Sequence, residues 1–312
     1  MFDLIIIGGA TAGLTSAIYA IRKKLKVLLL TKQIGGQSLL TDSIENFPGF
    51  ESITGVELVE KIRKQVEKLD IEIKEGMEVK SIEKTDSGFL VKIKSTPGVD
   101  INIDKFEARV LIIATGRKPR LLNVPGEEKF LGKGVSICSI CDAPLFQDKD
   151  VAVVGGGNAG LETALDLTKY AEKIYVLEAN GKIRGDEATQ EQLRKTGKVE
   201  FSVGVEIKEI KGSKLVESLL YKDKQTGQEK ELKVGGVFIN IGQIPATNFL
   251  KGFLELNQWG EIAIDPKTNQ TSVPGVFAAG DATDVKYKQC IIAAGEGAKA
   301  ALSAYEYLQK RH

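Results

Sequence analysis

The stretch DLIIIGGATAGLTSA, residues 3–17, is repeated later in the chain as DVAVVGGGNAGLETA, residues 150–164. Each copy begins with an apolar run that ends in glycines, continues into a helical pattern, and is followed by a second apolar run, KVLLL at 26–30 and KIYVLE at 173–178. Apolar runs of this length bounded by glycine are typical of buried parallel strands. The repeat therefore predicts two β–α–β units of the same design.

The small residues in each copy have the spacing of a dinucleotide-binding turn. The first copy reads G-x-A-x-x-G and the second G-x-G-x-x-G, at Gly8, Ala10 and Gly13, and at Gly155, Gly157 and Gly160. A first glycine permits the tight turn, a small third residue lets the backbone approach a pyrophosphate, and a small sixth residue lets the helix pack on the strand. One such motif is weak evidence, but two in the same β–α–β context predict an enzyme that binds a flavin and a nicotinamide dinucleotide.

The composition limits the classes of protein to which the chain could belong. The 312 residues suffice for two domains, and 42% hydrophobic with 27% charged residues is typical of a globular protein. The net charge of +1 is spread without a basic block, which argues against nucleic acid. Three cysteines are too few for a secreted disulfide scaffold, and neither a signal peptide nor an apolar run of about 20 residues is present. We expect a cytoplasmic protein that binds neither nucleic acid nor membrane.

An acid follows the second glycine turn but not the first. Glu178 ends the apolar run 18 residues past Gly160. A carboxylate there accepts hydrogen bonds from a ribose 2′-hydroxyl and repels a 2′-phosphate, which favours NADH over NADPH. The alternative is a solvated charge at a strand end. After the first copy stands a glycine pair, Gly35 and Gly36, which lets the backbone pass close to a ligand.

Further motifs, taken in order, resemble the low-molecular-weight thioredoxin reductase family, class II of the pyridine nucleotide-disulfide oxidoreductases, over nearly the whole chain. They are GGATAG (8–13), GGQ (35–37), ENFPGF (45–50), ATG (114–116), CSICD (138–142), GGGNAG (155–160), IGQIP (241–245), GD (280–281) and YKQ (287–289). A C-x-x-C pair just before the nicotinamide turn separates this group from other flavin disulfide reductases. CDAPLF, VLEANGKI and YKQCIIAAGEGAKAALSAYEYL are most similar to the reductase portion of the alkyl hydroperoxide reductase flavoprotein subunit.

The resemblance and the order of the motifs imply an α/β fold of two Rossmann-like, doubly wound, three-layer domains, the second inserted in the first. Residues 1–116 and 245–312 would form a discontinuous FAD-binding domain, and residues 117–244 an NAD(P)H-binding domain that carries the C-x-x-C pair. The glycine- and proline-containing stretches ATGRKP and GQIPA are the expected crossing points.

The same likeness assigns cofactor-binding residues. For FAD they are Gly8, Gly9, Ala10, Ala12, Gly13, Gly35, Gly36, Gln37, Asn46, Ala114, Thr115, Gly116, Gly280, Asp281, Lys288, Gln289 and Cys290. For NAD(P) they are Gly155, Gly157, Asn158, Ala159, Gly160, Glu178, Arg184, Ile241 and Gly242. Cys290 is interpreted as a buried small residue near the flavin and not as a catalytic thiol.

The sequence departs from the family at the nicotinamide site. NADPH-using members carry His-Arg-Arg and a further Arg after the second strand, whereas Glu178-Ala179-Asn180 stands here and Arg184 alone matches the last position. This implies NADH or dual use, and Arg184 keeps NADPH open.

The pair Cys138 and Cys141 could bind zinc, form a structural disulfide, be two unrelated thiols, or act as a redox dithiol. Zinc needs four ligands, and the chain adds only Cys290 and His312, so we predict no metal site. A disulfide across two residues would gain little stability. Two unrelated thiols remain the alternative to a redox pair.

The resemblance implies a role for each residue of this segment. Cys141 would face the flavin, Cys138 would attack the disulfide of the partner, and Asp142 would be the acid that moves protons. The alternative for Asp142 is an acid that merely complements a helix dipole.

The predicted function is an FAD-dependent protein-disulfide reductase, and the resemblance implies a homodimer. Its partner would be a separate thioredoxin-, glutaredoxin- or protein-disulfide-oxidoreductase-like protein, because no thioredoxin-fold segment precedes the first glycine turn. The alternatives are a flavin dithiol oxidase or reductase fed by a donor other than nicotinamide, and a redox-sensing binding protein in which FAD is structural.

Overall fold

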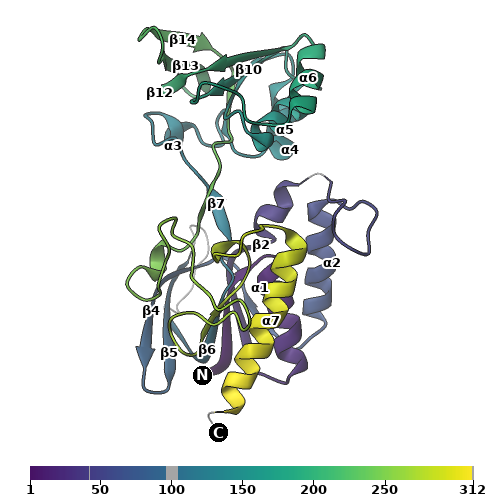
Figure 1. Cartoon of the computed structure of the whole chain (residues 1–312), viewed down its shortest axis with the longest axis vertical. Helices are drawn as coiled ribbons and strands as arrows, with labels where there is room; N and C mark the ends of the chain where they lie inside the picture. Colours follow the sequence, from purple (N-terminus) through teal and green to yellow (C-terminus); the bar gives the residue numbers. More distant parts are fainter. Residues whose placement is uncertain (42, 96–104, 311–312) are drawn as a thin grey trace. The chain divides into compact units, whose positions relative to one another are not determined.

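A computed structural model describes residues 1–41, 43–95 and 105–310 (Figure 1). The chain divides into two compact units: unit 1 is Met1–Lys118 with Ile244–His312, and unit 2 is Pro119–Gln243. Strands β7 (Arg117–Pro119) and β16 (Gln243–Pro245) pair with each other where the chain passes between the units. His312, weighed above as a zinc ligand, lies outside the described residues.

Unit 1 is built on a single sheet. In the residues described, the sheet has seven strands: six follow the order β3-β2-β1-β6-β5-β4, and the seventh, β17, pairs with β6. β1, β2, β3, β6 and β17 are parallel, and β4 and β5 are antiparallel. The bounds are β1 (Phe2–Gly9), β2 (Val27–Ile34), β3 (Glu72–Lys74), β4 (Met77–Thr85), β5 (Gly88–Ser95), β6 (Lys105–Ile113) and β17 (Val276–Ala278).

The two faces of this sheet pack against different layers. Along β1, Leu4 and Ile6 join a buried cluster with apolar residues of three helices, whereas Ile5 and Ile7 join one with β4, β5 and apolar residues between 249 and 264. This alternation follows from the two-residue period of a strand. Figure 1 shows the three helices, α1 (Thr11–Arg22), α2 (Gly55–Glu67) and α7 (Cys290–Gln309), lying together along one face.

Unit 2 repeats the plan. Its parallel strands follow the order β11-β10-β9-β15-β8 in the residues described. Val151 and Val153 pack toward helices, and Ala152 and Val154 toward an antiparallel sheet of β12, β13 and β14. The bounds are β8 (Val135–Ser136), β9 (Asp150–Val154), β10 (Lys173–Glu178), β11 (Val199–Val203), β15 (Gly236–Ile239), α4 (Ser139–Asp142), α5 (Asn158–Leu167), α6 (Glu187–Lys195), β12 (Val205–Gly212), β13 (Val216–Asp223) and β14 (Glu229–Lys233).

The remaining short elements are α3 (Glu127–Phe130), η1 (Gly36–Leu40), η2 (Ala143–Phe146), η3 (Asn248–Leu250) and η4 (Gly280–Ala282). The two predicted β–α–β units are β1–α1–β2 and β9–α5–β10, each with its strands parallel and adjacent. The predicted α/β class with two Rossmann-like, three-layer folds is confirmed. In unit 2 the layer opposite the helices is the antiparallel sheet of β12, β13 and β14, and in unit 1 apolar residues between 249 and 264 pack on the face opposite the helices. Across the described residues, no helix is both long and apolar enough to span a membrane.

Candidate active site

A cavity of about 610 Å³ opens in unit 1 at the carboxyl ends of the parallel strands. Five segments meet there: the β1–α1 turn, the stretch after β2, the end of β6, the end of β17 and the start of α7. Ligands of open α/β sheets bind at this edge. The predicted residues that line the cavity are Ala10, Ala12, Gly36, Gln37, Asn46, Ala114, Thr115, Gly116, Gly280, Asp281, Lys288, Gln289 and Cys290.

Four predicted FAD residues, Gly8, Gly9, Gly13 and Gly35, are not among the lining residues. Two of them shape the turn by close packing. A Cβ on Gly13 would lie 1.8 Å from the carbonyl oxygen of Gly8, and a Cβ on Gly8, where φ is +117°, would lie 2.2 Å from the carbonyl oxygen of Ala114. These glycines allow the helix to pack against the strand, while Ala10, Thr11 and Ala12 between them line the cavity.

The chemistry of the cavity fits FAD. Both α1 and α7 begin at it, and within the described chain no side chain caps either N-terminus, so oriented backbone N–H groups are available to phosphate or carbonyl oxygens. The buried Oγ1 of Thr115 likewise has no hydrogen-bond partner among the described residues. The volume lies within the range of about 300–1,000 Å³ typical of ligand pockets.

Several lining residues were not predicted: Thr11, Ser38, Thr41, Ser43, Ile44, Glu45, Arg117, Ala279 and Ala293. Of these, Glu45 belongs to the ENFPGF motif and Arg117 directly follows ATG, so both could have been found by extending those motifs. Cys290 is half-buried, and the prediction that it is buried was wrong. The first residue of α7 faces the cavity, where its Sγ lies 3.5 Å from the Oγ of Ser38.

The second glycine turn has the same construction in unit 2. A Cβ on Gly155, where φ is +120°, would lie 2.2 Å from the carbonyl oxygen of Asn240, and one on Gly160 would lie 1.9 Å from that of Gly155. A Cβ on Gly157 would meet nothing within 4 Å in the described structure. Gly157, the N-cap of α5, therefore offers an open approach to the backbone, and Asn158 and Ala159 follow it at the start of the helix.

Two further predicted NAD(P) residues, Ile241 and Gly242, follow β15. Gly242 has a positive φ of +92°, and Ile241 packs partly against the core of unit 2. Sequence reasoning missed their neighbour Asn240, whose side-chain amide donates to Thr163 Oγ1 on α5 at 2.8 Å. This bond joins the end of β15 to the helix that follows the glycine turn.

Glu178 is buried, with 3% of its surface exposed, so the alternative of a solvated strand-end charge was wrong. Its Oε2 accepts a hydrogen bond from Gly156 N at 2.7 Å, and its Oε1 accepts bonds from the backbone and side-chain amides of Asn180. Burial raises the pKa of the Glu178 carboxyl, but these donors, with nearby Arg184, outweigh it and hold the pKa below 4.5. The side chain of Arg184 is exposed, while its backbone N–H donates to Gly156 O at 2.8 Å.

Glu178→Gln is expected to destabilise unit 2 by about 2 kcal/mol at neutral pH, since a glutamine amide would turn N–H groups toward N–H donors. The folded-state pKa lies below 4.5, so the stabilisation is full above pH 4.5 and is lost as the pH falls through the folded value. The gap between wild type and variant should therefore close in acid. Urea unfolding from pH 7 to about pH 3 measures it.

The matched control for this prediction is Glu200→Gln on the adjacent strand β11, which removes a largely exposed carboxylate that pairs with Lys173 at 2.9 Å. Exposed pairs of this kind contribute about 0–1 kcal/mol, so this variant should differ little from wild type. A Glu178 gap that does not change with pH would contradict the assignment of an ionised, buried carboxylate.

Cys138 and Cys141 form a disulfide, with their Cα atoms 5.4 Å apart, so the alternative of two unrelated thiols was wrong. Cys138 is 8% exposed and is the N-cap of α4, whereas Cys141 is exposed. Asp142 lies half-buried at the end of α4, and its backbone N–H donates to Cys138 O at 3.2 Å. No group of three metal-ligating side chains occurs in the part of the chain that the structure describes.

Hydrogen bonds hold residues 138–142, here called the redox segment, on two sides. Ser136 Oγ donates to Cys138 O at 3.1 Å and accepts from Cys138 N at 3.0 Å. Ser139, between the two cysteines, donates its hydroxyl to Asp166 Oδ2 on α5 at 2.7 Å. The segment is therefore attached directly to the helix that begins at the second glycine turn.

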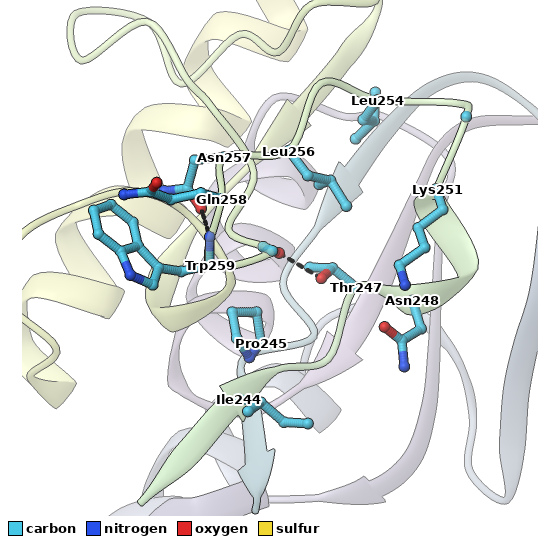
Figure 2. A pocket seen from close by; sticks show the side chains of 12 residues that line it. Ile244, Pro245, Thr247, Asn248, Lys251, Leu254, Leu256, Asn257, Gln258 and Trp259 are labelled. Atoms are coloured by element: carbon cyan, nitrogen blue, oxygen red, sulfur yellow. Dashed lines mark hydrogen bonds between the residues drawn. The ribbon is translucent and has the colours of Figure 1, made fainter.

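A second cavity, of about 490 Å³, lies in unit 1 between residues 244 and 260 and contains none of the predicted site residues. Figure 2 shows its lining, with the indole of Trp259 beside Asn257 and Gln258. Trp259 is 67% exposed, and its backbone N–H donates to Asn257 Oδ1 at 3.0 Å. The side-chain amide of Asn257 in this loop also donates to the carboxylate of Glu261.

Comparison with known proteins agrees with this geometry. Residues 2–297 match the family described as pyridine nucleotide-disulphide oxidoreductase. The chain is 41% identical over 307 residues to an alkyl hydroperoxide reductase component of Staphylococcus aureus (strain MRSA252), a match over 98% of this chain and 59% of that one. It is equally 41% identical over 307 residues to a protein named NADH dehydrogenase from Bacillus subtilis, over 98% and 58% of the two chains.

A solved thioredoxin reductase from Lactococcus lactis, in its FR conformation, is similar in structure, with a TM-score of 0.87 and 35% identity over 99% of this chain and all (100%) of that one. The chain thus matches this reductase over its whole length, but spans only 59% and 58% of the two curated relatives.

Proposed function

Because the chain belongs to the pyridine nucleotide-disulphide oxidoreductase family, a membership that implies FAD and a pyridine nucleotide as cofactors, we propose that it is a protein-disulfide reductase of the thioredoxin reductase type. Electrons would pass from NADH or NADPH through FAD and the Cys138–Cys141 pair to the disulfide of a thioredoxin- or glutaredoxin-like protein. The observation that carries the proposal is the Cys138–Cys141 disulfide in the same unit as the ligand-accessible turn at Gly157.

Unit 1 is the proposed FAD-binding domain and unit 2 the proposed NAD(P)H-binding domain. The β1–α1 turn and the N-terminus of α7 would hold polar groups of FAD, and Thr115 would supply a hydroxyl to them. When bound, FAD supplies the step from two-electron hydride chemistry to disulfide chemistry. The N-terminus of α5 at Gly157 would hold the nicotinamide pyrophosphate.

The redox segment then completes a balanced exchange. The Cys138–Cys141 disulfide takes up two electrons and two protons and becomes a dithiol. One thiolate attacks a sulfur of the partner disulfide and forms a mixed disulfide, and the second displaces the partner as a dithiol. The proposed roles are Cys138 as the attacking thiol, Cys141 as the thiol next to the flavin, and Asp142 as the acid that moves a proton.

The burial of the two cysteines adds a requirement to this assignment. Cys138 is the more buried of the two in the oxidised segment, while Cys141 is exposed. An attacking sulfur must reach its target, so the proposed role of Cys138 requires α4 to move after reduction. The homodimer remains a prediction from the resemblance, and the cytoplasmic location remains a prediction from the composition.

NADH is the proposed electron donor. The negative charge of Glu178 at the end of β10, which disfavours a 2′-phosphate, and the name of the Bacillus subtilis relative support it. Flavin in the FAD-loaded protein should be bleached faster by NADH than by NADPH at equal concentration under anaerobic stopped-flow conditions. Arg184→Ala should slow bleaching by NADPH more than by NADH, because a 2′-phosphate binds a cation and a 2′-hydroxyl does not need one.

Each result of that experiment leads to a definite conclusion. Faster bleaching by NADPH would contradict the preference for NADH and assign the 2′-phosphate to Arg184. If neither nucleotide bleaches the flavin, the nicotinamide proposal fails, and a disulfide reductase fed by another donor replaces it. Bleaching without subsequent reduction of any thioredoxin-like disulfide would contradict the proposed acceptor.

A further inference from the structure

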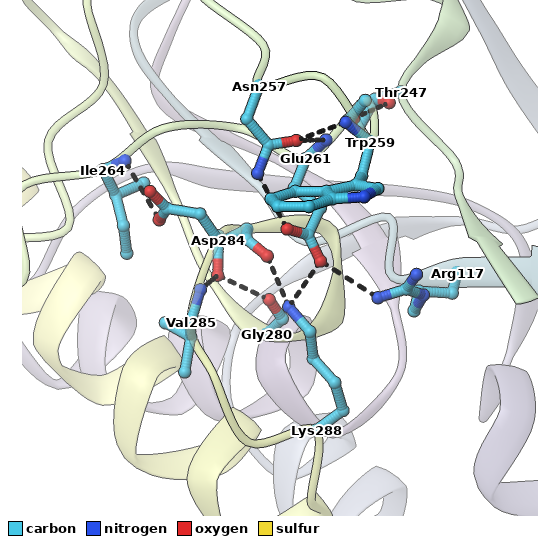
Figure 3. Close-up of polar contacts among 12 residues, drawn as sticks. Arg117, Thr247, Asn257, Trp259, Glu261, Ile264, Gly280, Asp284, Val285 and Lys288 are labelled. Atoms are coloured by element: carbon cyan, nitrogen blue, oxygen red, sulfur yellow. Dashed lines mark hydrogen bonds and ion pairs between the residues drawn. The ribbon is translucent and has the colours of Figure 1, made fainter.

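One carboxylate outside the first cavity holds two cations that line it. Glu261 Oε1 lies 3.1 Å from Arg117 Nη1 and 3.2 Å from Lys288 Nζ, as Figure 3 shows. Arg117 and Lys288 both line the 610 Å³ cavity, whereas Glu261 does not. The backbone of Arg117 is also held, because its carbonyl oxygen accepts a hydrogen bond from Gln37 Nε2 at 2.6 Å. Glu261 therefore connects two cationic side chains that line the proposed FAD site.

Glu261 is held in place by the neighbouring loop. Asn257 Nδ2 donates to Glu261 Oε2 at 2.8 Å, and Asn257 Oδ1 accepts the backbone N–H of Glu261 at 3.0 Å. Only 14% of the Glu261 side chain is exposed. Burial raises the pKa of this carboxyl, but Asn257, Lys288 and Arg117 outweigh it and hold the pKa below its ordinary value, so Glu261 is ionised at neutral pH.

The charged groups at the cavity are of both signs. Arg117 and Lys288 are cationic, and Glu261 offsets part of their charge from behind. Asp281 also lines the cavity, and burial raises the pKa of its carboxyl despite Lys288 and Arg117. Reduction adds negative charge to a flavin, and fixed charges near the flavin tune its electron affinity. A carboxylate behind two cations thus weakens the preference for the reduced form.

We propose that Glu261 is a positioning residue for the flavin: it orients Lys288 and Arg117 at the cavity wall and, by offsetting their charge, lowers the electron affinity of the bound cofactor. The inference rests on the proposed function, because it assumes that FAD occupies this cavity. It assigns a role to a residue that lies in none of the sequence motifs and that touches the cofactor site through other side chains. Outer groups that orient and tune a redox centre in this way are well known for metal sites.

The test uses the full-length, FAD-loaded protein with Glu261→Gln. At a fixed potential against a reference dye, the ratio of reduced to oxidised flavin should rise about tenfold, because one negative charge near the cations is lost. Lys288→Gln should move the ratio in the opposite direction. Opposite shifts from the two partners of one ion pair are not expected from a loss of packing, which would act in the same direction in both.

Glu296→Gln is the matched control. Glu296 is also in unit 1, its side chain is 12% exposed, and it binds Lys299 at 3.0 Å and the side-chain amide of Asn269, neither of which lines the cavity. The control should leave the flavin ratio unchanged. Equal shifts in Glu261→Gln and Glu296→Gln, or no shift in Glu261→Gln and Lys288→Gln, would overturn the inference.

Two further readouts separate this inference from its premise. If wild-type protein takes up no FAD, the proposed function itself fails, and the inference fails with it. If FAD binds and nicotinamide bleaches it but the ratio does not respond to Glu261, only the inference is lost. Should Glu261→Gln not fold, Lys288→Gln alone carries the test. A ratio of reduced to oxidised flavin in Lys288→Gln at or above that of wild type then overturns the inference.

Discussion

Replacing Cys138 or Cys141 with serine should lower nicotinamide-driven reduction of a thioredoxin-like disulfide by at least about a thousandfold, the scale seen when a nucleophile is removed from an enzyme. Disulfide exchange needs both sulfurs, one to form the mixed disulfide and one to resolve it. Bleaching of the flavin by nicotinamide should survive in both variants, because it precedes the disulfide step. Each variant therefore carries its own control for folding and cofactor binding.

The two serine variants should differ in one further respect. If Cys138 is the attacking thiol, Cys141→Ser protein should accumulate a mixed disulfide with the partner, visible as a higher-mass species on a non-reducing gel, and Cys138→Ser protein should not. The reverse result would reassign the attack to Cys141, the exposed sulfur of the oxidised segment. Partner reduction at the wild-type rate in either variant would contradict the redox role of the pair.

Gly157→Ala and Gly160→Ala should fail in different ways, although they change neighbouring glycines of one turn. A Cβ on Gly160 would lie 1.9 Å from Gly155 O, so this variant should lose at least about 2 kcal/mol of stability through overpacking. A Cβ on Gly157 has nothing within 4 Å in the described chain and a φ of −87° that alanine adopts, so this variant should fold normally. It should instead weaken nicotinamide binding at least about tenfold, because the methyl group occupies the path of the pyrophosphate.

The measurements are thermal or urea unfolding for stability and nucleotide titration of flavin bleaching for binding. Unit 1 offers an independent check, since FAD content should be unaffected by Gly157→Ala. Normal nucleotide binding by Gly157→Ala would show that the dinucleotide does not approach this turn. Normal stability of Gly160→Ala would contradict the close contact between α5 and the turn that follows β9.

The sequence predicted the features that depend on local spacing. Small residues at the first, third and sixth positions of a strand–helix turn, and apolar runs on either side, are sufficient to predict β1–α1–β2 and β9–α5–β10, because turn and strand geometry depend on neighbouring residues. The C-x-x-C spacing likewise predicted that Cys138 and Cys141 act together. The motif order indicated the family before any tertiary contact was known.

Gly8 and Gly13 pack closely against backbone and Ala10 lines the cavity, as the spacing of the turn predicts. Only the tertiary structure decided that Gly36 lines the cavity and that its neighbour Gly35 does not. From the sequence, Glu178 could have been solvated or buried. In the fold it is buried, and hydrogen bonds from the backbone amides of Gly156 and Asn180 stabilise its carboxylate there.

The pairing of Arg117 with Glu261 joins residues separated by 144 positions. No periodicity extends over such a distance, and the sequence shows no motif at Glu261. Charge interactions depend on distance and burial in the folded chain. The glycine turns and the cysteine pair were therefore determined by the sequence, whereas the electrostatic environment of the proposed flavin site was decided by the fold.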